Sequence, residues 1–293
     1  MKNIKKKIFI FGSAGDVGSD LVKYFSNDYY VYAFQRSKKT KDIKNLNVKY
    51  IYHDFTKPLK SKIKPEIIIN CVVSHDFSKK SKFSNLILNN CLSILNITEL
   101  AKLNKIKIVN LSSVVIFDGY NMKTLFEKSP IPDTNLLGSL KLLVEKSIKF
   151  QNLEYINLRL PGVLCESKNF QRPWLKKIIY NIRQNKNILV YNKNESFNNL
   201  ITSKEIFKFI DFIIKKNTFY KGTYNFSASK PIKIQELLKL VKNYYKSSSI
   251  IKFSNTKKNT FVISNNKLEK NFKFKLNSTN NLLLDYFNDL KNI

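Results

Sequence analysis

The sequence has few cysteines, few glycines and no long apolar run, and each shortage argues against a class of protein. Its three cysteines, Cys71, Cys91 and Cys165, are odd in number and lie in apolar contexts. That pattern argues against a disulfide framework and favours a reducing, cytoplasmic compartment. The cysteines show no metal-ligand spacing either, so we expect no metal site. No apolar run approaches the roughly 18 to 20 residues that span a bilayer.

Acidic residues are scarce relative to basic ones, which gives the chain a formal charge of +31 from 52 basic and 21 acidic residues. The lysines are scattered through every segment rather than gathered in a block. We interpret them as a solvated basic surface that would attract an anionic ligand such as a nucleotide. Nucleic-acid binding remains an alternative that rests on composition alone.

The 293 residues, 43% of them apolar, are enough for a substantial core. Short β-rich runs alternate with helical patterns in the first half, which is typical of a parallel sheet. We predict strands at 7–11, 29–34, 48–53, 67–73, 107–111 and 155–158, and helices at 19–26, 86–103 and 136–150. The sequence therefore predicts an α/β fold of the Rossmann type, a doubly wound parallel sheet.

Past Pro161 the alternation weakens, and no linker separates independent domains. Helices are predicted at 174–185, 203–215, 234–245 and 280–290, and strands at 222–226 and 250–253. We expect a nucleotide-binding domain over 1–160, with 200–225 returning to it. Residues 161–293 would form a smaller α/β substrate lobe.

Three of the seven glycines fall within one seven-residue turn between the first strand and the first helix. The turn reads Gly12-Ser13-Ala14-Gly15-Asp16-Val17-Gly18. Gly12 would permit the tight turn, Gly15 would admit a pyrophosphate, and Gly18 would let the helix lie close to the sheet. The helix start would then present free N–H groups to the phosphates. The turn predicts a dinucleotide site.

The choice of cofactor depends on the end of the second strand, where an NAD enzyme usually has a carboxylate. This chain has Gln35-Arg36-Ser37 instead. A guanidinium at Arg36 suits a 2′-phosphate, so we favour NADP and keep NAD as the alternative.

With these motifs the chain resembles the extended short-chain dehydrogenase/reductase family, which includes nucleotide-sugar epimerases, dehydratases and reductases. The likeness covers nearly the whole length, and the segment Phe117-Asp118-Gly119 is most similar to the dTDP-4-dehydrorhamnose reductase branch. The resemblance implies a nucleotide-sugar substrate, and it implies that a homodimer can form through two helices. It also places further residues beside the cofactor: Asp54, Phe55, Cys71, Val72, Val73, Asn90, Leu111, Pro161 and Val163.

The family's chemistry uses a tyrosine and a lysine four residues apart on one helix, helped by a serine. Ser113 and Lys141 match the serine and the lysine, whereas the tyrosine position is Leu137. A leucine cannot move a proton, so Tyr120 is a candidate substitute and a water held by Ser113 is another. The favoured alternative for Tyr120 is an ordinary loop tyrosine, one of 15 in the chain. Trp174 and Arg172 are candidates to contact the nucleotide in the substrate lobe, with core packing of the tryptophan and a surface charge at the arginine as the alternatives. Two functions follow: a nucleotide-sugar reductase or epimerase, or a non-catalytic NADP(H)-binding protein.

Overall fold

A seven-stranded parallel sheet forms the centre of the computed structural model, which describes residues 5–38, 42–74, 82–118, 122–166, 173–256 and 258–291. The strand order is β12-β7-β5-β4-β1-β2-β3. The strands are β1 (Lys7–Phe11), β2 (Tyr30–Gln35), β3 (Val48–Tyr52), β4 (Ile67–Asn70), β5 (Lys107–Ser113), β7 (Tyr155–Leu160) and β12 (Gly222–Asn225). The order reverses between β1 and β4, so the doubly wound α/β fold is confirmed.

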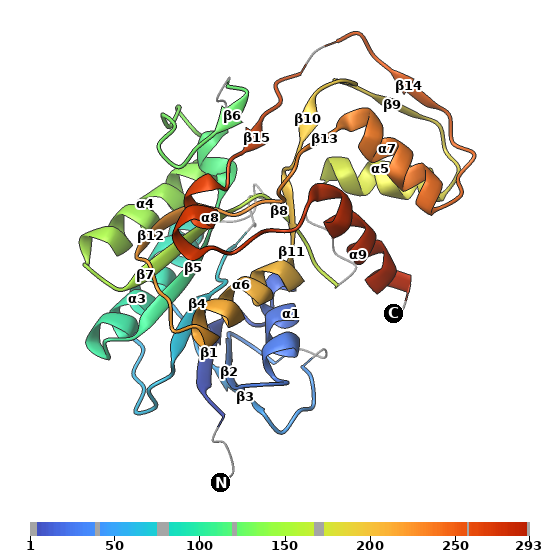
Figure 1. The fold of residues 1–293 in the computed structure, drawn as a ribbon. Helices are drawn as coiled ribbons and strands as arrows, with labels where there is room; N and C mark the ends of the chain where they lie inside the picture. The colour runs from blue at the N-terminus through green and yellow to red at the C-terminus, as the bar shows by residue number, and fades with distance from the viewer. Residues whose placement is uncertain are drawn as a thin grey trace.

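Helices cover both faces of this sheet (Figure 1). On one face, α1 (Asp16–Phe25) and α6 (Ser203–Lys215) pack against each other and bury Leu21 and Phe209. On the other face, α3 (Ser93–Leu103) and α4 (Leu136–Phe150) bury Ile94 and Val144 beneath Phe9 of β1. With both faces covered, the central strands are almost wholly apolar, as Ile67-Ile68-Ile69 shows.

Outside the central sheet, the described part of the chain forms pairs of short strands and further helices, of which α8 packs against the edge strand β12 (Figure 1). The pairs are β8 (Gly162–Leu164) with β11 (Leu200–Thr202), β9 (Ile188–Val190) with β14 (Ile251–Phe253), β10 (Ser196–Phe197) with β13 (Ile232–Lys233), and β6 (Thr124–Leu125) with β15 (Val262–Ile263). The helices are α5 (Pro173–Arg183), α7 (Ile234–Tyr244), α8 (Asn266–Phe272) and α9 (Thr279–Lys291). In the described part of the chain, no helix is both long and apolar enough to cross a membrane.

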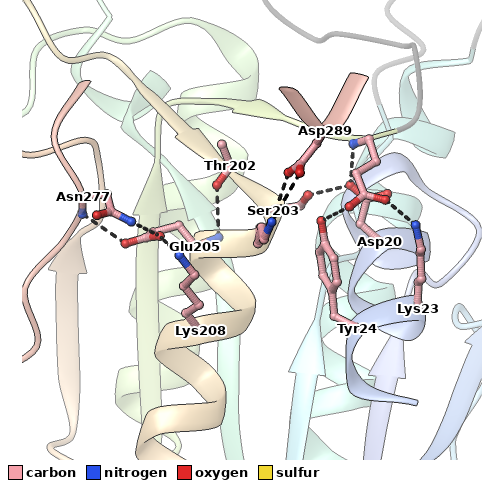
Figure 2. Close-up of polar contacts among 11 residues, drawn as sticks. Asp20, Lys23, Tyr24, Thr202, Ser203, Glu205, Lys208, Asn277 and Asp289 are labelled. Carbon is pink, nitrogen blue, oxygen red and sulfur yellow. Dashed lines mark hydrogen bonds and ion pairs between the residues drawn. The ribbon is translucent and has the colours of Figure 1, made fainter. Parts of the chain in front are cut away.

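A polar cluster joins the first helix to the C-terminal half (Figure 2). The buried Asp20 carboxylate on α1 accepts hydrogen bonds from Ser203 Oγ at 2.5 Å and from the Glu166 backbone N–H at 2.9 Å. Glu166 in turn accepts from Lys23 Nζ at 2.6 Å and from the Tyr24 hydroxyl at 2.5 Å. These bonds attach α1 to Glu166, two residues past the end of β8, and to the start of α6.

The structure differs from several predicted element bounds. The strand predicted over 67–73 ends at Asn70. The single helix predicted over 86–103 consists of α2 (Phe83–Ile87), a π-helical turn (Leu88–Leu92) and α3. A π turn inserts one extra residue into the helical repeat, which the apolar spacing does not reveal. The first helix begins at Asp16 rather than Ser19, because the backbone of the glycine turn enters the helix directly.

Candidate functional site

The glycine turn brings the end of β1, the loop after β4 and the start of α1 into close contact. Gly12 has a φ of +77°, and a Cβ there would lie 2.9 to 3.0 Å from backbone atoms of Cys71 and Val72. A Cβ on Gly18 would lie 2.2 Å from the Gly12 carbonyl oxygen. The backbone at both positions therefore leaves room for a hydrogen and for no side chain.

The start of α1 faces this turn without a side-chain cap. Gly15 is its N-cap residue and makes no side-chain capping hydrogen bond. The first N–H groups of a helix have no partner within the helix and carry its positive dipole end. An anionic group fits this position, since backbone N–H groups and the helix dipole both favour it.

A cavity of about 260 Å³ opens beside the turn. Nine predicted cofactor residues line it: Gly12, Ala14, Gly15, Arg36, Ser37, Phe55, Cys71, Val72 and Val73. Four further lining residues were not predicted as site residues: Gln35, Ser74, Asn89 and Ser93. Asn89 lies in the π-helical turn, and Ser93 directly follows it. The sequence pattern assumed a regular α-helix here, so it did not reveal that these two side chains face the cavity.

The remaining predicted cofactor residues are not among those that line this cavity. Ser13 is buried and donates its hydroxyl to the Phe34 carbonyl at 3.0 Å, which ties the turn to β2. Asn90 bonds the Ser74 N–H at 2.9 Å and the Ser74 carbonyl at 3.1 Å, so it supports a lining residue. Other predicted residues occupy the helix start (Asp16, Val17, Gly18), the end of β5 (Leu111), and β8 with the residue before it (Pro161, Val163).

Asp54 lies in an exposed turn after β3 rather than on the cavity wall. Its carboxylate accepts from the hydroxyl of Thr56 at 2.8 Å and from the Thr56 backbone N–H at 3.0 Å. These two hydrogen bonds hold the pKa of Asp54 below its ordinary value. The residue next to it, Phe55, is the one that reaches the cavity.

The end of β2 carries one cation and one amide at the cavity edge. Arg36 is exposed and its Nη1 donates to Asn89 Oδ1 at 3.0 Å. Gln35 is 1% exposed, and its Nε2 donates to the two carboxylate oxygens of Asp42 at 3.0 and 2.9 Å. Asp42, seven positions further along the sequence than Gln35, was not predicted as a neighbour of this strand end.

Lys141 lies on α4 with its amine buried at the end of β5. Its Nζ donates to the Leu111 carbonyl at 3.3 Å, and the side chain is near Cys71. Burial lowers the pKa of Lys141 to about 8, although the Glu145 carboxylate acts in the opposite direction. Glu145 itself pairs with Arg159 at 2.7 Å and accepts from Ser112 Oγ at 2.5 Å, so the region holds a buried polar network.

Ser113 and Leu137 lie at adjacent helix starts. Ser113 ends β5 and its Oγ accepts from the Val115 N–H at 3.2 Å. Leu137 is half-buried in the first turn of α4, whose N-cap Asn135 accepts from the Gly138 N–H at 3.0 Å and donates to Asp118 at 2.6 Å. Tyr120 and Arg172 lie outside the described residues. Neither Ser113 nor Lys141 is among the residues that line the 260 Å³ cavity.

A larger cavity of about 820 Å³ lies among α5, β9, β10, α7 and residues 258–261. Trp174 lines it and packs against Phe197 with ring centroids 5.6 Å apart. Lys258 stands over the Tyr191 ring at 4.2 Å, and both line the cavity. Aromatic faces, amides and the two lysines Lys177 and Lys258 surround the space, with Asp118 as the carboxylate among the described lining residues.

Comparisons with known proteins agree on the fold. Over 97–99% of each chain, solved structures match at TM-scores of 0.78 and 0.79: the enzyme WbmG from Bordetella bronchiseptica in complex with NAD (14% identity, 99% of this chain and 97% of that chain), and UDP-glucuronic acid 4-epimerase from Bacillus cereus in complex with NAD (15% identity, 98% and 99%). ADP-L-glycero-D-manno-heptose-6-epimerase from Helicobacter pylori matches at 0.79 (15% identity, 99% and 97%). A search of curated proteins with this sequence finds no match.

A protein-family pattern identifies the group to which the chain is related. The pattern described as the RmlD substrate binding domain matches residues 6–290. It therefore spans both cavities and the helix that carries Lys141. The chain belongs to this family, within the extended short-chain dehydrogenase/reductases.

Proposed function

We propose that this protein is a nicotinamide-dinucleotide-dependent oxidoreductase or epimerase that acts on a nucleotide-activated sugar. The glycine turn carries the proposal: Gly12 and Gly18 leave no room for a Cβ, and the uncapped start of α1 faces a cavity. This is the arrangement that accepts a pyrophosphate at a helix start. Two proteins of similar structure, WbmG and the Bacillus cereus epimerase, were solved in complex with NAD.

We propose NADP(H) as the preferred form. Arg36 lines the cavity at the end of β2, where an adenine ribose would lie. The carboxylate of Asp42, which is bonded to that strand end, is already engaged by the Gln35 amide at 2.9 and 3.0 Å. A guanidinium on the cavity wall favours a 2′-phosphate over a bare hydroxyl.

The 820 Å³ cavity is the proposed substrate site. Trp174 and Tyr191 offer aromatic faces for a base, and Lys177 and Lys258 offer positive charge for a diphosphate. The solved UDP-N-acetylglucosamine 4-epimerase from Methanobrevibacter ruminantium, at 18% identity, contains UDP-N-acetylmuramic acid. A nucleotide-linked sugar is the ligand class whose aromatic, anionic and hydroxyl parts match this lining.

The residues around the turn fit a bound nicotinamide dinucleotide, which would supply hydride transfer. Lys141, whose amine is held at the Leu111 carbonyl, would bind the ribose hydroxyls. Ser113, held in place by the Val115 N–H, would donate its hydroxyl to a substrate oxygen. Leu137 supplies no proton. Tyr120, or a water held by Ser113, would complete the proton transfer at the sugar oxygen.

The test of this proposal is turnover. The full chain is incubated with NADP(H) or NAD(H) and with UDP-, GDP- and dTDP-linked 4-keto sugars, and oxidation of the reduced cofactor is followed at 340 nm. The epimerase activity is tested by product analysis with the corresponding hydroxy sugars. Turnover with one of these substrates supports the proposal, and binding of dinucleotide with no turnover on any of them rejects the enzymatic function.

The second candidate function is a binding protein that uses the dinucleotide as a structural or sensing ligand. Leu137 favours it, since the position required for proton transfer carries a hydrocarbon side chain. The discriminating variant is Leu137→Tyr, with Leu136→Tyr as the control one residue away on the same helix turn. A large gain in oxidoreductase activity in Leu137→Tyr alone indicates a degenerate enzyme. Activity in the unmodified chain rejects the binding-only function.

Two expectations about partners stay predictions. Homodimer formation is tested by the mass of the full chain in solution, and sedimentation as a monomer contradicts it. Nucleic-acid binding driven by the +31 charge would be salt-dependent and independent of dinucleotide, and we expect none at physiological salt.

A further inference from the structure

Three asparagines form a continuous row of hydrogen bonds across the centre of the buried sheet. Asn70, Asn110 and Asn157 are 0%, 1% and 0% exposed, and they occupy paired positions on β4, β5 and β7. Asn70 Nδ2 donates to Asn110 Oδ1 at 2.8 Å, and Asn110 Nδ2 donates to Asn157 Oδ1 at 2.9 Å. Asn157 Nδ2 donates to Thr223 Oγ1 on β12 at 3.2 Å.

Amides are unexpected at these positions. Strands buried on both faces are almost wholly apolar, and a buried amide without partners is destabilising. Neighbouring strands lie about 4.8 Å apart, so side chains at paired positions can bond directly, as asparagine ladders do in stacked sheets. Every donor in this row points from β4 towards β12, so the amide dipoles are aligned and reinforce one another.

At its β4 end, the row of amides bonds to the backbone of the loop that follows the strand. Asn70 Oδ1 accepts from the backbone N–H of Val72 at 3.1 Å. The Val72 nitrogen is also 3.0 Å from the place that a Cβ on Gly12 would take. Val72 and its neighbours Cys71 and Val73 line the 260 Å³ cavity. The row therefore ends on one of the backbone atoms of the cavity wall that lie closest to the glycine turn.

We propose that Asn110 and Asn157 are positioning residues for the dinucleotide site, acting through Asn70 on the Val72 backbone. The proposal rests on the proposed function only for the identity of the ligand, because the position of Val72 can be measured in the ligand-free protein. Removing the middle amide would leave Asn70 Nδ2 and Asn157 Oδ1 without their partners in the row. Asn70 would then turn to other partners and release the Val72 N–H.

The variant is Asn110→Ala in the full chain, and its control is Ile108→Val. Ile108 is fully buried on the same face of the same strand and takes no part in the row, so its truncation lowers stability without changing the amides. The first readout is hydrogen–deuterium exchange at the Val72 amide without ligand. The second is the Kd for NADPH and for NADH by titration.

We expect Val72 exchange to be about tenfold faster in Asn110→Ala and changed by less than about twofold in Ile108→Val. The Kd for the dinucleotide should rise about tenfold in Asn110→Ala only. Equal Val72 exchange in the two variants overturns the proposal, and so does faster exchange with an unchanged Kd. If the unmodified chain binds neither dinucleotide, the proposed function fails, while the exchange rates still decide whether the row holds Val72.

A second pair of variants covers the case in which Asn110→Ala does not fold. Thr223 is half-buried on the edge strand β12, at the far end of the row. Thr223→Val removes the last acceptor, whereas Thr223→Ser keeps the hydroxyl. Faster Val72 exchange in Thr223→Val that Thr223→Ser restores supports the row as a connected unit. Identical exchange in the two variants contradicts it.

Discussion

The carbonyl oxygen of Gly12 lies so close to Gly18 that a Cβ on residue 18 would be 2.2 Å from it. The atom that would have to move is backbone, held by the hydrogen bond from Gly15 N–H to Gly12 O at 3.0 Å. The turn and the first helix can therefore pack this closely only because residue 18 has no side chain.

Gly18→Ala should lower the free energy of unfolding by about 3 kcal/mol, because the turn has to move to admit the methyl group. Gly15→Ala is the matched control, since a Cβ there would lie 3.3 Å from the same oxygen and needs only a small adjustment. Urea unfolding measures both. Gly15→Ala should keep most of the stability but weaken dinucleotide binding, and equal stability of the two variants contradicts this account of the turn.

Lys141→Met should stabilise the protein near pH 7. Burial lowers the pKa of Lys141 to about 8 from an ordinary 10.5, so the folded protein carries a buried charge below pH 8. That burial costs on the order of 3 kcal/mol. Between pH 8 and 10.5 the unfolded chain binds more protons, and the stability of the unmodified protein therefore rises with pH.

The difference in the free energy of unfolding between Lys141→Met and the unmodified chain should accordingly become smaller as pH rises from 8 to 10.5. Urea unfolding experiments measure this difference. The variant should also lose dinucleotide affinity if the amine binds the ribose. A gap that does not change with pH would show that the amine keeps its charge in the folded protein.

Arg36→Gln should weaken NADPH binding by about tenfold or more and leave NADH binding nearly unchanged, because the lost charge-assisted bonds involve only the 2′-phosphate. Lys38→Gln, an exposed lysine two residues further along, is the control for loss of charge alone. Fluorescence titration with both reduced dinucleotides measures the ratio of the Kd for NADPH to the Kd for NADH. An equal loss for NADPH and NADH would place the guanidinium away from the 2′ position.

Asp20→Asn should be at least as stable as the unmodified chain at pH 7, whereas Asp20→Ala should be less stable by about 1–3 kcal/mol. Burial raises the pKa of Asp20 above its ordinary 3.8, so the charged form is disfavoured in the folded protein. That cost appears as pH rises through the folded pKa and disappears below about pH 4. An asparagine amide can bond both Ser203 and the Glu166 N–H (Figure 2).

Unfolding at pH 7 and at pH 3.5 measures this difference. The advantage of Asp20→Asn should be present at pH 7 and absent at pH 3.5. A variant that is less stable than the unmodified chain at pH 7 would show that the Asp20 carboxylate stabilises the cluster as an anion.

The features that could be predicted from the sequence are those determined by residues that lie close together along the chain. The strand Lys7–Phe11, the turn from Gly12 to Gly18 and the helix that follows are contiguous, so their order and spacing predict the site locally. The run Ile67–Ile69 predicts a strand buried on both faces for the same reason.

The features that were missed depend on register between distant segments. Asn70, Asn110 and Asn157 are 40 and 47 residues apart, and only the pairing of β4, β5 and β7 aligns them. The π-helical turn near Asn90 depends on one extra residue per turn, which leaves the apolar pattern nearly unchanged. Among the short strands beyond the sheet, Ile251–Phe253 was predicted within 250–253, whereas the others in the described part of the chain carry too few residues for a periodicity to show.

The most direct test is isothermal titration calorimetry of the full chain with NADPH and with NADH. We predict saturable binding of one dinucleotide per chain, tighter for NADPH, and weaker binding in Gly15→Ala. Absence of saturable binding for both dinucleotides would contradict the central claim that the glycine turn and the start of α1 form a dinucleotide site.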